Sequence, residues 1–379
     1  MWHCNRICHV PHRARKLEIV STRKRYATFA AKGCSDSERN GVGLAATTPD
    51  WEAIHLFLEV ARRGSFRSAS DHLGLSINAL RRRIAELEAR LDVALFTRHV
   101  DGVRTTAEGE EILVAARKME TASFGLIRAR DRSSPALSGE VKLAVTEGLG
   151  TFWLVPRLVE FQRVNSRLLV DINCAMRSAD VLRLEADASV QLTKPTNPDL
   201  KLVKLGRLHS MPFAAPSYIE TYGVPKTVEE GLNHRLVMQV ADQTATEELF
   251  EKTYPGINKT GVVVMRTNVS SAHIWAISKG AGIGLLPTYV HAIAARIVPV
   301  DVGLTFSFDI WLTYHPDAVR IPRVRRMVDW LIDAFDPRRF PWFRDEFIHP
   351  KDLPREYRGA PIVNLFEGFF GANNQKSHL

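Results

Sequence analysis

The chain has 379 residues, of which 45% are hydrophobic and 25% are charged, and its formal net charge is +9 at pH 7. This composition is that of a globular protein and excludes collagen-like, low-complexity and disulfide-scaffold classes. The excess of positive charge favours a polyanionic partner, either nucleic acid or an anionic membrane surface. No run of about 18 apolar residues occurs, so no membrane span is expected. The four cysteines form no disulfide framework and suit a reducing compartment.

Residues 1–47 are rich in arginine and lysine, poor in acids, and lack a sustained apolar period. We expect a disordered basic extension. Its composition resembles a transit peptide, but a start codon upstream of the true one is the interpretation that we favour. The cysteines and histidines of this segment lack the spacing of a structural zinc site, so no metal is expected there.

Three helices are predicted between residues 51 and 91. Apolar residues recur every three or four positions from Trp51, and Gly64 ends this first helix. Ser65 caps a short second helix, Gly74 supplies the tight turn after it, and Ser76 caps a third helix. A short helix, a glycine turn and a basic second helix form the helix-turn-helix plan, in which the start of the last helix enters the DNA major groove.

The third helix has one apolar face, from Leu80 to Leu91, and one polar face. Arginine and asparagine can bind base edges through paired hydrogen bonds, so the polar face is suited to reading DNA. The residues outside the apolar stripe are Asn78, Arg81, Arg82 and, near the helix end, Arg90.

A β-hairpin with its turn at Asp101-Gly102 is expected over residues 95–105. Such a hairpin would be the wing of a winged helix-turn-helix, with Arg98, His99 and Arg104 available for phosphates or a minor groove. The alternative is a solvated basic face on any small domain. The joint occurrence of caps, glycine turn, third helix and hairpin argues against that alternative.

These segments resemble the N-terminal domain of LysR-type transcriptional regulators. The similar motifs are residues 56–61, 64–70, 73–76, 84–88, Leu91, 95–98 and 106–109. The resemblance implies a winged helix-turn-helix at residues 48–109. It places Ser65, Arg67, Ser76, Asn78, Arg81 and Arg82 near DNA and Arg98 on the wing. Ile77 and Arg81 replace the commoner residues of the family at two base-reading positions, so the operator sequence does not carry over.

A long helix is predicted from a cap at Thr106 to about Arg130, and residues 128–135 have the composition of a hinge. A narrow apolar stripe on a long helix favours pairing with a second helix. We therefore expect residues 110–136 to be a dimerising linker, with packing on its own domain as the alternative. Dimerisation would place two recognition helices on the half-sites of a palindromic operator.

Residues 137–336 alternate predicted strands and helices, which indicates a mostly parallel α/β body large enough for two lobes. A helix is expected over residues 152–163. The strand candidates are residues 141–145, 168–172, 188–192, 202–205, 211–215, 235–239, 261–266, 283–286, 297–300 and 306–314.

This body resembles the effector-binding domain of the same family, most closely at residues 277–287. The resemblance implies two Rossmann-like lobes, similar to periplasmic binding proteins, with a small-molecule cleft between them. Ligands in such folds lie at strand carboxyl ends and helix N-termini. The residues expected there are Thr146, Glu147, Arg177, Ser178, Thr267, Asn268 and Ser270. Each of them, taken singly, is equally well explained as a loop residue that caps a helix.

Two of these candidates point to different ligands. Arg177 could hold a carboxylate effector bidentately. Glu147 would repel an anion or pair with Arg177, which leaves a cationic or neutral ligand open.

The sequence contains none of the common hydrolase, zinc-protease or phosphate-loop motifs, so no catalytic residue and no cofactor are expected. The glycines at 280, 282 and 284 lack the context of a dinucleotide site. Residues 337–379 form a C-terminal tail that opens with dense aromatic residues. We expect this tail to fold over its own lobe, and a subunit contact is the alternative.

The sequence therefore predicts a cytoplasmic transcriptional regulator, not an enzyme, that binds double-stranded DNA and a small-molecule effector as a homodimer or homotetramer. RNA polymerase is a further candidate partner, and no membrane is expected. One rival interpretation is a small-molecule-binding protein or enzyme that is tethered to nucleic acid by a basic module. Another is an architectural DNA binder whose α/β body serves only to oligomerise.

Overall fold

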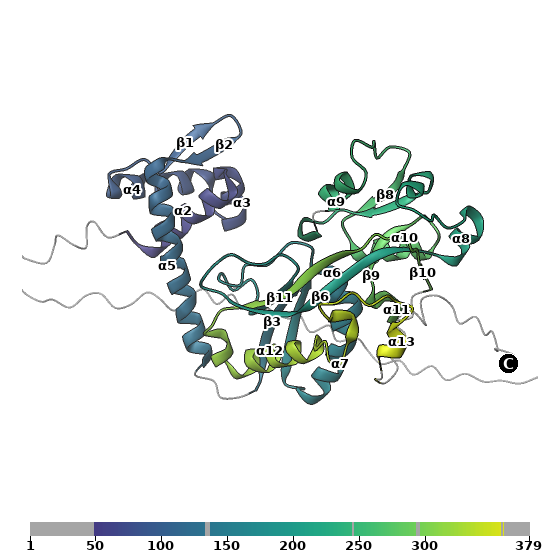
Figure 1. The fold of residues 1–379 in the computed structure, drawn as a ribbon. Coiled ribbons are helices and arrows are strands. Elements are labelled where there is room, and N and C mark those ends of the chain that lie inside the picture. Colours follow the sequence, from purple (N-terminus) through teal and green to yellow (C-terminus); the bar gives the residue numbers. More distant parts are fainter. Residues whose placement is uncertain (1–48, 133–136, 245, 293–295, 358, 360–379) are drawn as a thin grey trace, which may run out of the picture.

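The computed structural model describes residues 49–132, 137–244, 246–292, 296–357 and 359. A small helical domain, one long helix and a large α/β body follow one another along the chain (Figure 1). The basic extension expected at residues 1–47 lies outside the described residues. Most of the tail beyond residue 357 also lies outside them. No helix in the described segments is long and apolar enough to cross a membrane.

The N-terminal domain contains α2 (Trp51–Arg63), α3 (Phe66–Leu73) and α4 (Ile77–Leu91). The predicted caps are confirmed. Gly64 and Gly74 end the first two helices in the left-handed conformation, at φ 60° and 65°. Ser65 and Ser76 begin the next two, and their hydroxyl groups accept hydrogen bonds from the backbone of Ser68 and Ala79.

The apolar faces of these helices meet in one core. Leu80, Ile84 and Leu87 of α4 are buried against Phe57 and Leu58 of α2. Burying a side chain of this size stabilises the fold by about 1.5–3 kcal/mol. The core therefore fixes which face of α4 points outward.

The hairpin consists of β1 (Phe96–His99) and β2 (Gly102–Thr105), and its turn differs from the prediction by one residue. His99 pairs with Gly102, so Val100 and Asp101 form the turn instead of Asp101 and Gly102. The reason lies in a contact with the end of α2. Gly102 has φ 139°, and a Cβ added there would lie 2.2 Å from the Gly64 carbonyl oxygen. The glycine is needed for close approach, not for the turn.

The long helix is α5 (Ala107–Arg132), and Thr106 caps it by accepting a hydrogen bond from the Gly109 N–H at 2.8 Å. It extends two residues beyond the predicted end, into the segment expected to be a hinge. Leu113 and Ala116 in its first half are buried on α2. Leu126 in its second half is 75% exposed, so the predicted stripe is only partly covered within one chain.

The main sheet of the body runs in the order β10-β6-β11-β5-β3-β4, with β9 also paired to β6. Its members are β3 (Gly139–Val145), β4 (Leu168–Cys174), β5 (Ala188–Gln191), β6 (Lys201–Ala214), β9 (Gly284–Pro287), β10 (Val298–Pro299) and β11 (Phe306–Tyr314).

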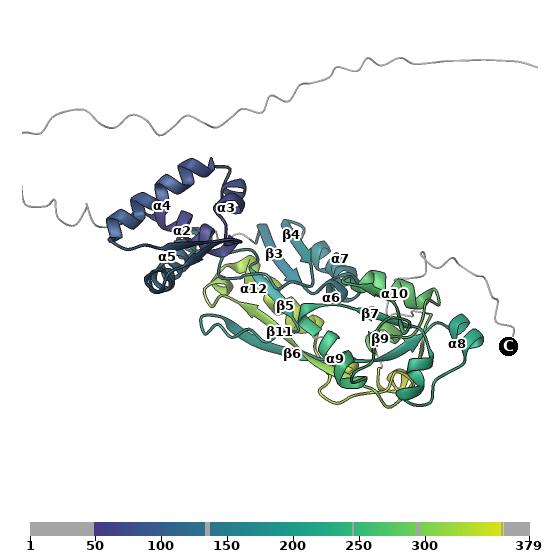
Figure 2. The same ribbon diagram turned by 90° about the horizontal axis from the view of Figure 1, so that it is seen from above.

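Two sequence predictions about this sheet are wrong. The expected strands at 202–205 and 211–215 are one strand, β6. The body is also not mostly parallel: β3 pairs in parallel with β4 and β5, but β6 pairs antiparallel with β9, β10 and β11. The long antiparallel pair of β6 and β11 joins the two lobes (Figure 2).

One lobe holds β3, β4 and β5 with α7 (Val155–Val164) and α12 (Pro322–Ala334). The other holds the parallel pair β7 (Leu236–Gln239) and β8 (Val263–Thr267). Its helices are α8 (Pro216–Tyr222), α9 (Thr246–Thr253) and α10 (Ser270–Ser278). Between β3 and α7 the chain forms the short helix α6 (Glu147–Leu149) and a π-helical turn (Gly150–Leu154). The helix α11 (Tyr289–Ala292) follows β9.

The start of the tail folds over its own chain, as expected. Phe340, Trp342 and Phe343 are buried, and their rings lie 4.9, 5.4 and 4.9 Å from the ring of Trp153. The short helix α13 (Leu353–Glu356) follows them. Dense edge-to-face ring contacts of this kind stabilise a core beyond the area that they bury.

Candidate DNA interface and effector cavity

The first candidate site is the outward face of the N-terminal domain. Asn78, Arg81 and Arg82 are exposed on α4, and Arg67 is exposed on α3. The Arg81 guanidinium lies 5.8 Å from the ring centroid of Phe66, which orients it across the two helices. Polar and cationic groups at the start of a helix and on its neighbour can contact base edges and phosphates together.

The two serines of this site stabilise helix ends in the protein without DNA. Ser65 and Ser76 use their hydroxyl groups as helix caps. Arg82 lies 3.7 Å from the Glu86 carboxylate on the same helix, an exposed pair that contributes little stability. Arg82 can therefore turn to a phosphate at small cost.

The wing adds two exposed arginines, Arg98 on β1 and Arg104 on β2. They lie near each other because Thr97 pairs with Arg104 and Arg98 with Val103. The structure thus brings all eight residues predicted for DNA onto the surface of one small domain.

The second candidate site is a cavity of about 170 Å³ in the body. Thr146, Gly148 and Phe152 line it from the β3 lobe, and β7, α9 and α10 line it from the other lobe. Among the described residues, no aspartate, glutamate, lysine or arginine contributes to its wall. Apolar side chains dominate, among them Leu236, Met238, Leu249, Phe250, Ile274 and Phe306.

Uncharged polar residues also line this cavity, among them Thr146, Gln239, Ser270 and His273. The Thr146 side chain is 3% exposed, and its hydroxyl has no hydrogen-bond partner among the described residues. His273 donates from Nε2 to the Val237 carbonyl oxygen at 3.0 Å. Burial lowers the pKa of His273 to about 4, so its ring is neutral at pH 7. The Ser270 hydroxyl accepts from the Gln239 amide at 2.7 Å.

Glu147 lies beside the cavity and faces the start of α10. Its carboxylate accepts hydrogen bonds from the Ser271 N–H at 3.1 Å and the Thr151 hydroxyl at 3.2 Å. A helix N-terminus attracts anions through its free N–H groups. In this protein a side chain of the protein itself supplies that negative charge.

The predicted cleft residues are thus divided. Thr146 and Ser270 line the cavity, and Glu147 borders it, whereas the structure does not bring Arg177, Ser178, Thr267 or Asn268 into its wall. The Arg177 side chain is 78% exposed and lies 3.7 Å from Glu185. Its neighbour Met176 lines the cavity instead. Thr267 uses its hydroxyl to accept from the Val269 N–H.

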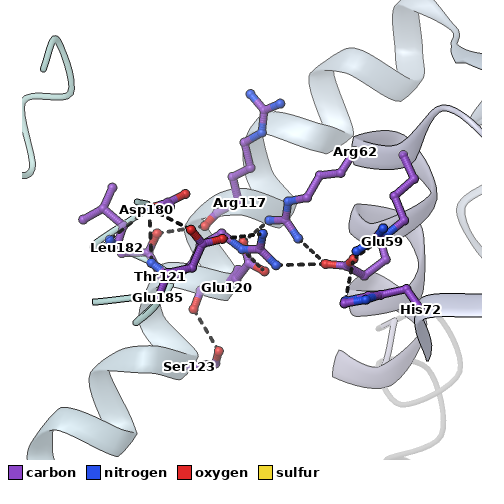
Figure 3. A network of polar contacts seen from close by, with 12 residues as sticks. Glu59, Arg62, His72, Arg117, Glu120, Thr121, Ser123, Asp180, Leu182 and Glu185 are labelled. Carbon is purple, nitrogen blue, oxygen red and sulfur yellow. Dashed lines mark hydrogen bonds and ion pairs between the residues drawn. The ribbon is translucent and has the colours of Figure 1, made fainter. Parts of the chain in front are cut away.

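A third feature joins the N-terminal domain to the body. Two buried carboxylates, Glu59 of α2 and Glu120 of α5, face the guanidinium group of Arg62 of α2 (Figure 3). They also face the guanidinium group of Arg183, in the loop between β4 and β5. Arg183 lies 2.9 Å from Glu59 and 3.5 Å from Glu120. We call these four residues the interdomain ion network.

Electrostatics favour the charged form of Glu59. Burial by itself raises the pKa of Glu59, but hydrogen bonding and charge from Arg62, with Arg183 nearby, outweigh it and hold the pKa below the usual range. His55, Glu59 and Glu120 place ligand atoms within 4.8 Å of one another, as in a metal site. The two arginines already neutralise the carboxylates, so we interpret the cluster as an ion network.

Sequence reasoning missed this network and most of the cavity wall. Glu120 follows the buried Leu113 and Ala116 at helical spacing, so a charge on an apolar stripe was the available signal. Arg183 gave no signal, because its partners lie far away in the chain.

A winged helix-turn-helix joined by a long helix to a two-lobed α/β body is the architecture of a ligand-responsive DNA-binding regulator. Comparison with known proteins identifies the family. Residues 51–110 match the model of the bacterial regulatory helix-turn-helix protein, lysR family, and residues 134–336 match the LysR substrate binding domain. The chain belongs to the LysR family of transcriptional regulators, as the resemblance implied.

Individual relatives are regulators of the same kind. An HTH-type transcriptional regulator of Xanthomonas campestris is 31% identical over 50% of this chain and 55% of that protein. The uncharacterized HTH-type transcriptional regulator YcaN of Escherichia coli is 30% identical over 61% of this chain and 76% of that protein. Among solved structures, ArgP of Mycobacterium tuberculosis has a TM-score of 0.49 at 16% identity, covering 76% of this chain and 98% of that chain.

Proposed function

We propose that this regulator binds double-stranded DNA with the start of α4 in the major groove and the hairpin wing on the phosphate backbone. The observation that carries this proposal is the joint exposure of Asn78, Arg81, Arg82 and Arg98 on one domain surface. Ser65, Arg67, Ser76 and Arg104 complete the contact surface. Base edges are read by the α4 residues, and the wing arginines contribute affinity without sequence preference.

In this proposal residues 48–109 bind DNA, residues 110–136 link and dimerise, and residues 137–336 bind the effector. The exposed apolar residues in the second half of α5 support a second copy as partner. A homodimer presents two α4 helices to a palindromic operator, and a homotetramer would present four. The protein acts on chromosomal DNA in the cytoplasm, where RNA polymerase is available as a partner.

The effector is proposed to bind in the cavity between the lobes and to act by population shift. A ligand that favours one arrangement of the lobes changes the position of the loop that carries Arg183. That loop contacts α2 and α5 through the interdomain ion network, so the change reaches the DNA-binding domain. We propose a regulatory role and no catalytic one.

The test is selection of bound duplexes from a random pool at a stated salt concentration, with the full-length protein and an Arg81→Ala, Arg82→Ala double variant. We expect an enriched palindromic site that the variant fails to enrich. An Arg325→Ala, Arg326→Ala double variant is the matched control, because it removes the same charge from exposed positions on α12. Equal, salt-sensitive binding of all duplexes by every protein would contradict the proposal.

A further inference from the structure

The wall of the cavity defines which molecules can enter it. The charged groups described beside it, Glu147 and Arg177, are already paired or turned away, and His273 is neutral and buried. Transferring an ion into such surroundings without a partner is strongly unfavourable. An ionised ligand would have to leave water without gaining a compensating charge.

Glu147 strengthens this selection against anions. Its carboxylate occupies the N-terminus of α10, at 3.1 Å from the Ser271 N–H. A carboxylate ligand at the same helix end would find the Ser271 N–H already bonded to Glu147. It would also be repelled by the negative charge of the Glu147 carboxylate. Arg177, the residue that could have balanced such a ligand, is 78% exposed on the outer loop.

Thr146 supplies a buried polar group that lacks a partner in the described wall. It begins α6 without a side-chain cap bond, so its hydroxyl is not used to hold the helix. A buried hydroxyl without a partner is unfavourable, and a ligand oxygen can remove this deficit.

The volume of the cavity gives the scale of a ligand that it can hold. Its volume is about 170 Å³, and an apolar protein cavity of roughly 150 Å³ binds benzene. From these observations we propose that the effector cavity takes a compact, uncharged, mainly apolar molecule of about one six-membered ring, whose neutral polar group hydrogen-bonds to Thr146. This inference rests on the effector role proposed above and names its ligand class.

The test uses benzyl alcohol, toluene and benzoate, which share a ring but differ in polarity and charge. Binding to the full-length protein is measured by thermal shift and by titration calorimetry. Benzyl alcohol is expected to bind most tightly, with benzoate at least tenfold weaker. Benzoate binding as tightly as benzyl alcohol, or binding by neither neutral probe, would overturn the proposal.

Two variants distinguish the proposed hydrogen bond to Thr146 from an effect on packing alone. Thr146→Val keeps the side-chain shape and is expected to weaken benzyl alcohol by about three- to tenfold while leaving toluene unchanged. Thr313→Val is the control, because the Thr313 hydroxyl is also buried without a partner among the described residues but lies in β11 away from the cavity wall. Equal benzyl alcohol affinity in wild type and Thr146→Val would remove Thr146 from the proposal.

The same preparation is assayed for selective DNA binding, so the two proposals can fail separately. Selective DNA binding without binding of either neutral probe would overturn the ligand class alone. Loss of DNA selectivity with benzyl alcohol still bound would overturn the regulatory function and leave the chemistry of the cavity intact.

Discussion

Arg183 and Glu59 lie 124 positions apart in the chain, yet the guanidinium of the first donates a hydrogen bond of 2.9 Å to the carboxylate of the second. Arg183 stands in a loop that Asp180 shapes by accepting hydrogen bonds from two successive backbone N–H groups. Leu184, which follows, has φ 58°, an uncommon conformation for leucine. The loop thus presents Arg183 to α2 and α5.

Replacing Arg183 by alanine should destabilise the protein. Glu59 and Glu120 would remain buried, with Arg62 as the arginine that still contacts both. Breaking a fully buried pair costs about 3–5 kcal/mol. Because Arg183 is 26% exposed, we expect a smaller decrease in the free energy of unfolding, about 1–3 kcal/mol. Chemical denaturation measures it.

Arg177→Ala is the control for that change, since Arg177 lies on the same loop but forms its ion pair with Glu185 at the surface. It should alter stability by less than about 0.5 kcal/mol. If the network also carries the effector signal, Arg183→Ala should reduce the effect of benzyl alcohol on DNA affinity, whereas Arg177→Ala should not. Equal effects of both variants would contradict the assigned role of Arg183.

The lowered pKa of Glu59 predicts acid sensitivity of a definite sign. A carboxyl group whose pKa is lower in the folded state stabilises the protein above its unfolded pKa of about 4.3, and this contribution is lost as pH falls through the folded pKa. We therefore expect the difference in unfolding free energy between wild type and Glu59→Gln to shrink as pH falls below about 4.3. Denaturation curves at matched ionic strength measure it, and a difference that grows on acidification would refute the assignment.

Gly102 should tolerate no side chain. Its φ of 139° is unfavourable for other residues, and a Cβ would overlap the Gly64 carbonyl oxygen. We expect Gly102→Ala to destabilise the N-terminal domain by about 1–3 kcal/mol and to weaken DNA binding through displacement of the wing. Gly125→Ala in α5 is the control: no atom of the described residues lies within 4 Å of the place that its Cβ would occupy, so this change should be neutral or stabilising by up to about 1 kcal/mol. Thermal unfolding of both variants measures these changes in stability.

The local parts of this fold were readable from the sequence because their causes are local. Ser65 and Ser76 act as caps within four residues of the groups that they bind, and the apolar spacing of α4 is set by the helix period. The hairpin turn was predicted one residue too late because Gly102 is required for close contact with Gly64. Sequence rules for turns do not include such tertiary contacts.

The body was harder to predict because its polar residues are satisfied by distant partners. His209 falls between the two strand candidates at 202–205 and 211–215, but it lies inside β6 and hydrogen-bonds to Ser307 at 2.8 Å and to the Arg344 carbonyl oxygen at 2.9 Å. The cavity shows the same limit. Thr146 and Ser270 follow from their places at strand ends, whereas the outward position of Arg177 depends on the conformation of its loop.

Wing and recognition helix should respond differently to mutation. Arg98→Ala is expected to weaken binding to all duplexes by a similar factor and to reduce the slope of log affinity against log salt by about one. Asn78→Ala should instead weaken the binding free energy for the selected site by about 1–3 kcal/mol and change the binding of unrelated DNA little. Salt titrations of fluorescence anisotropy on both duplexes measure these effects. Uniform weakening by Asn78→Ala would remove it from base recognition.

The exposed end of α5 should control assembly. Leu126 is 75% exposed within one chain, and a charge at such a position in a helix pair is unfavourable because it would be buried without a partner. We expect Leu126→Glu to shift the protein from dimer toward monomer in analytical ultracentrifugation and to weaken binding to a palindromic site much more than to a single half-site. Val224→Glu is the control, because Val224 is also an exposed apolar residue, 50% accessible, but lies after α8. A Leu126→Glu protein that stays dimeric would show that the second copy binds elsewhere, and the two recognition helices would then be spaced by the body instead of by α5.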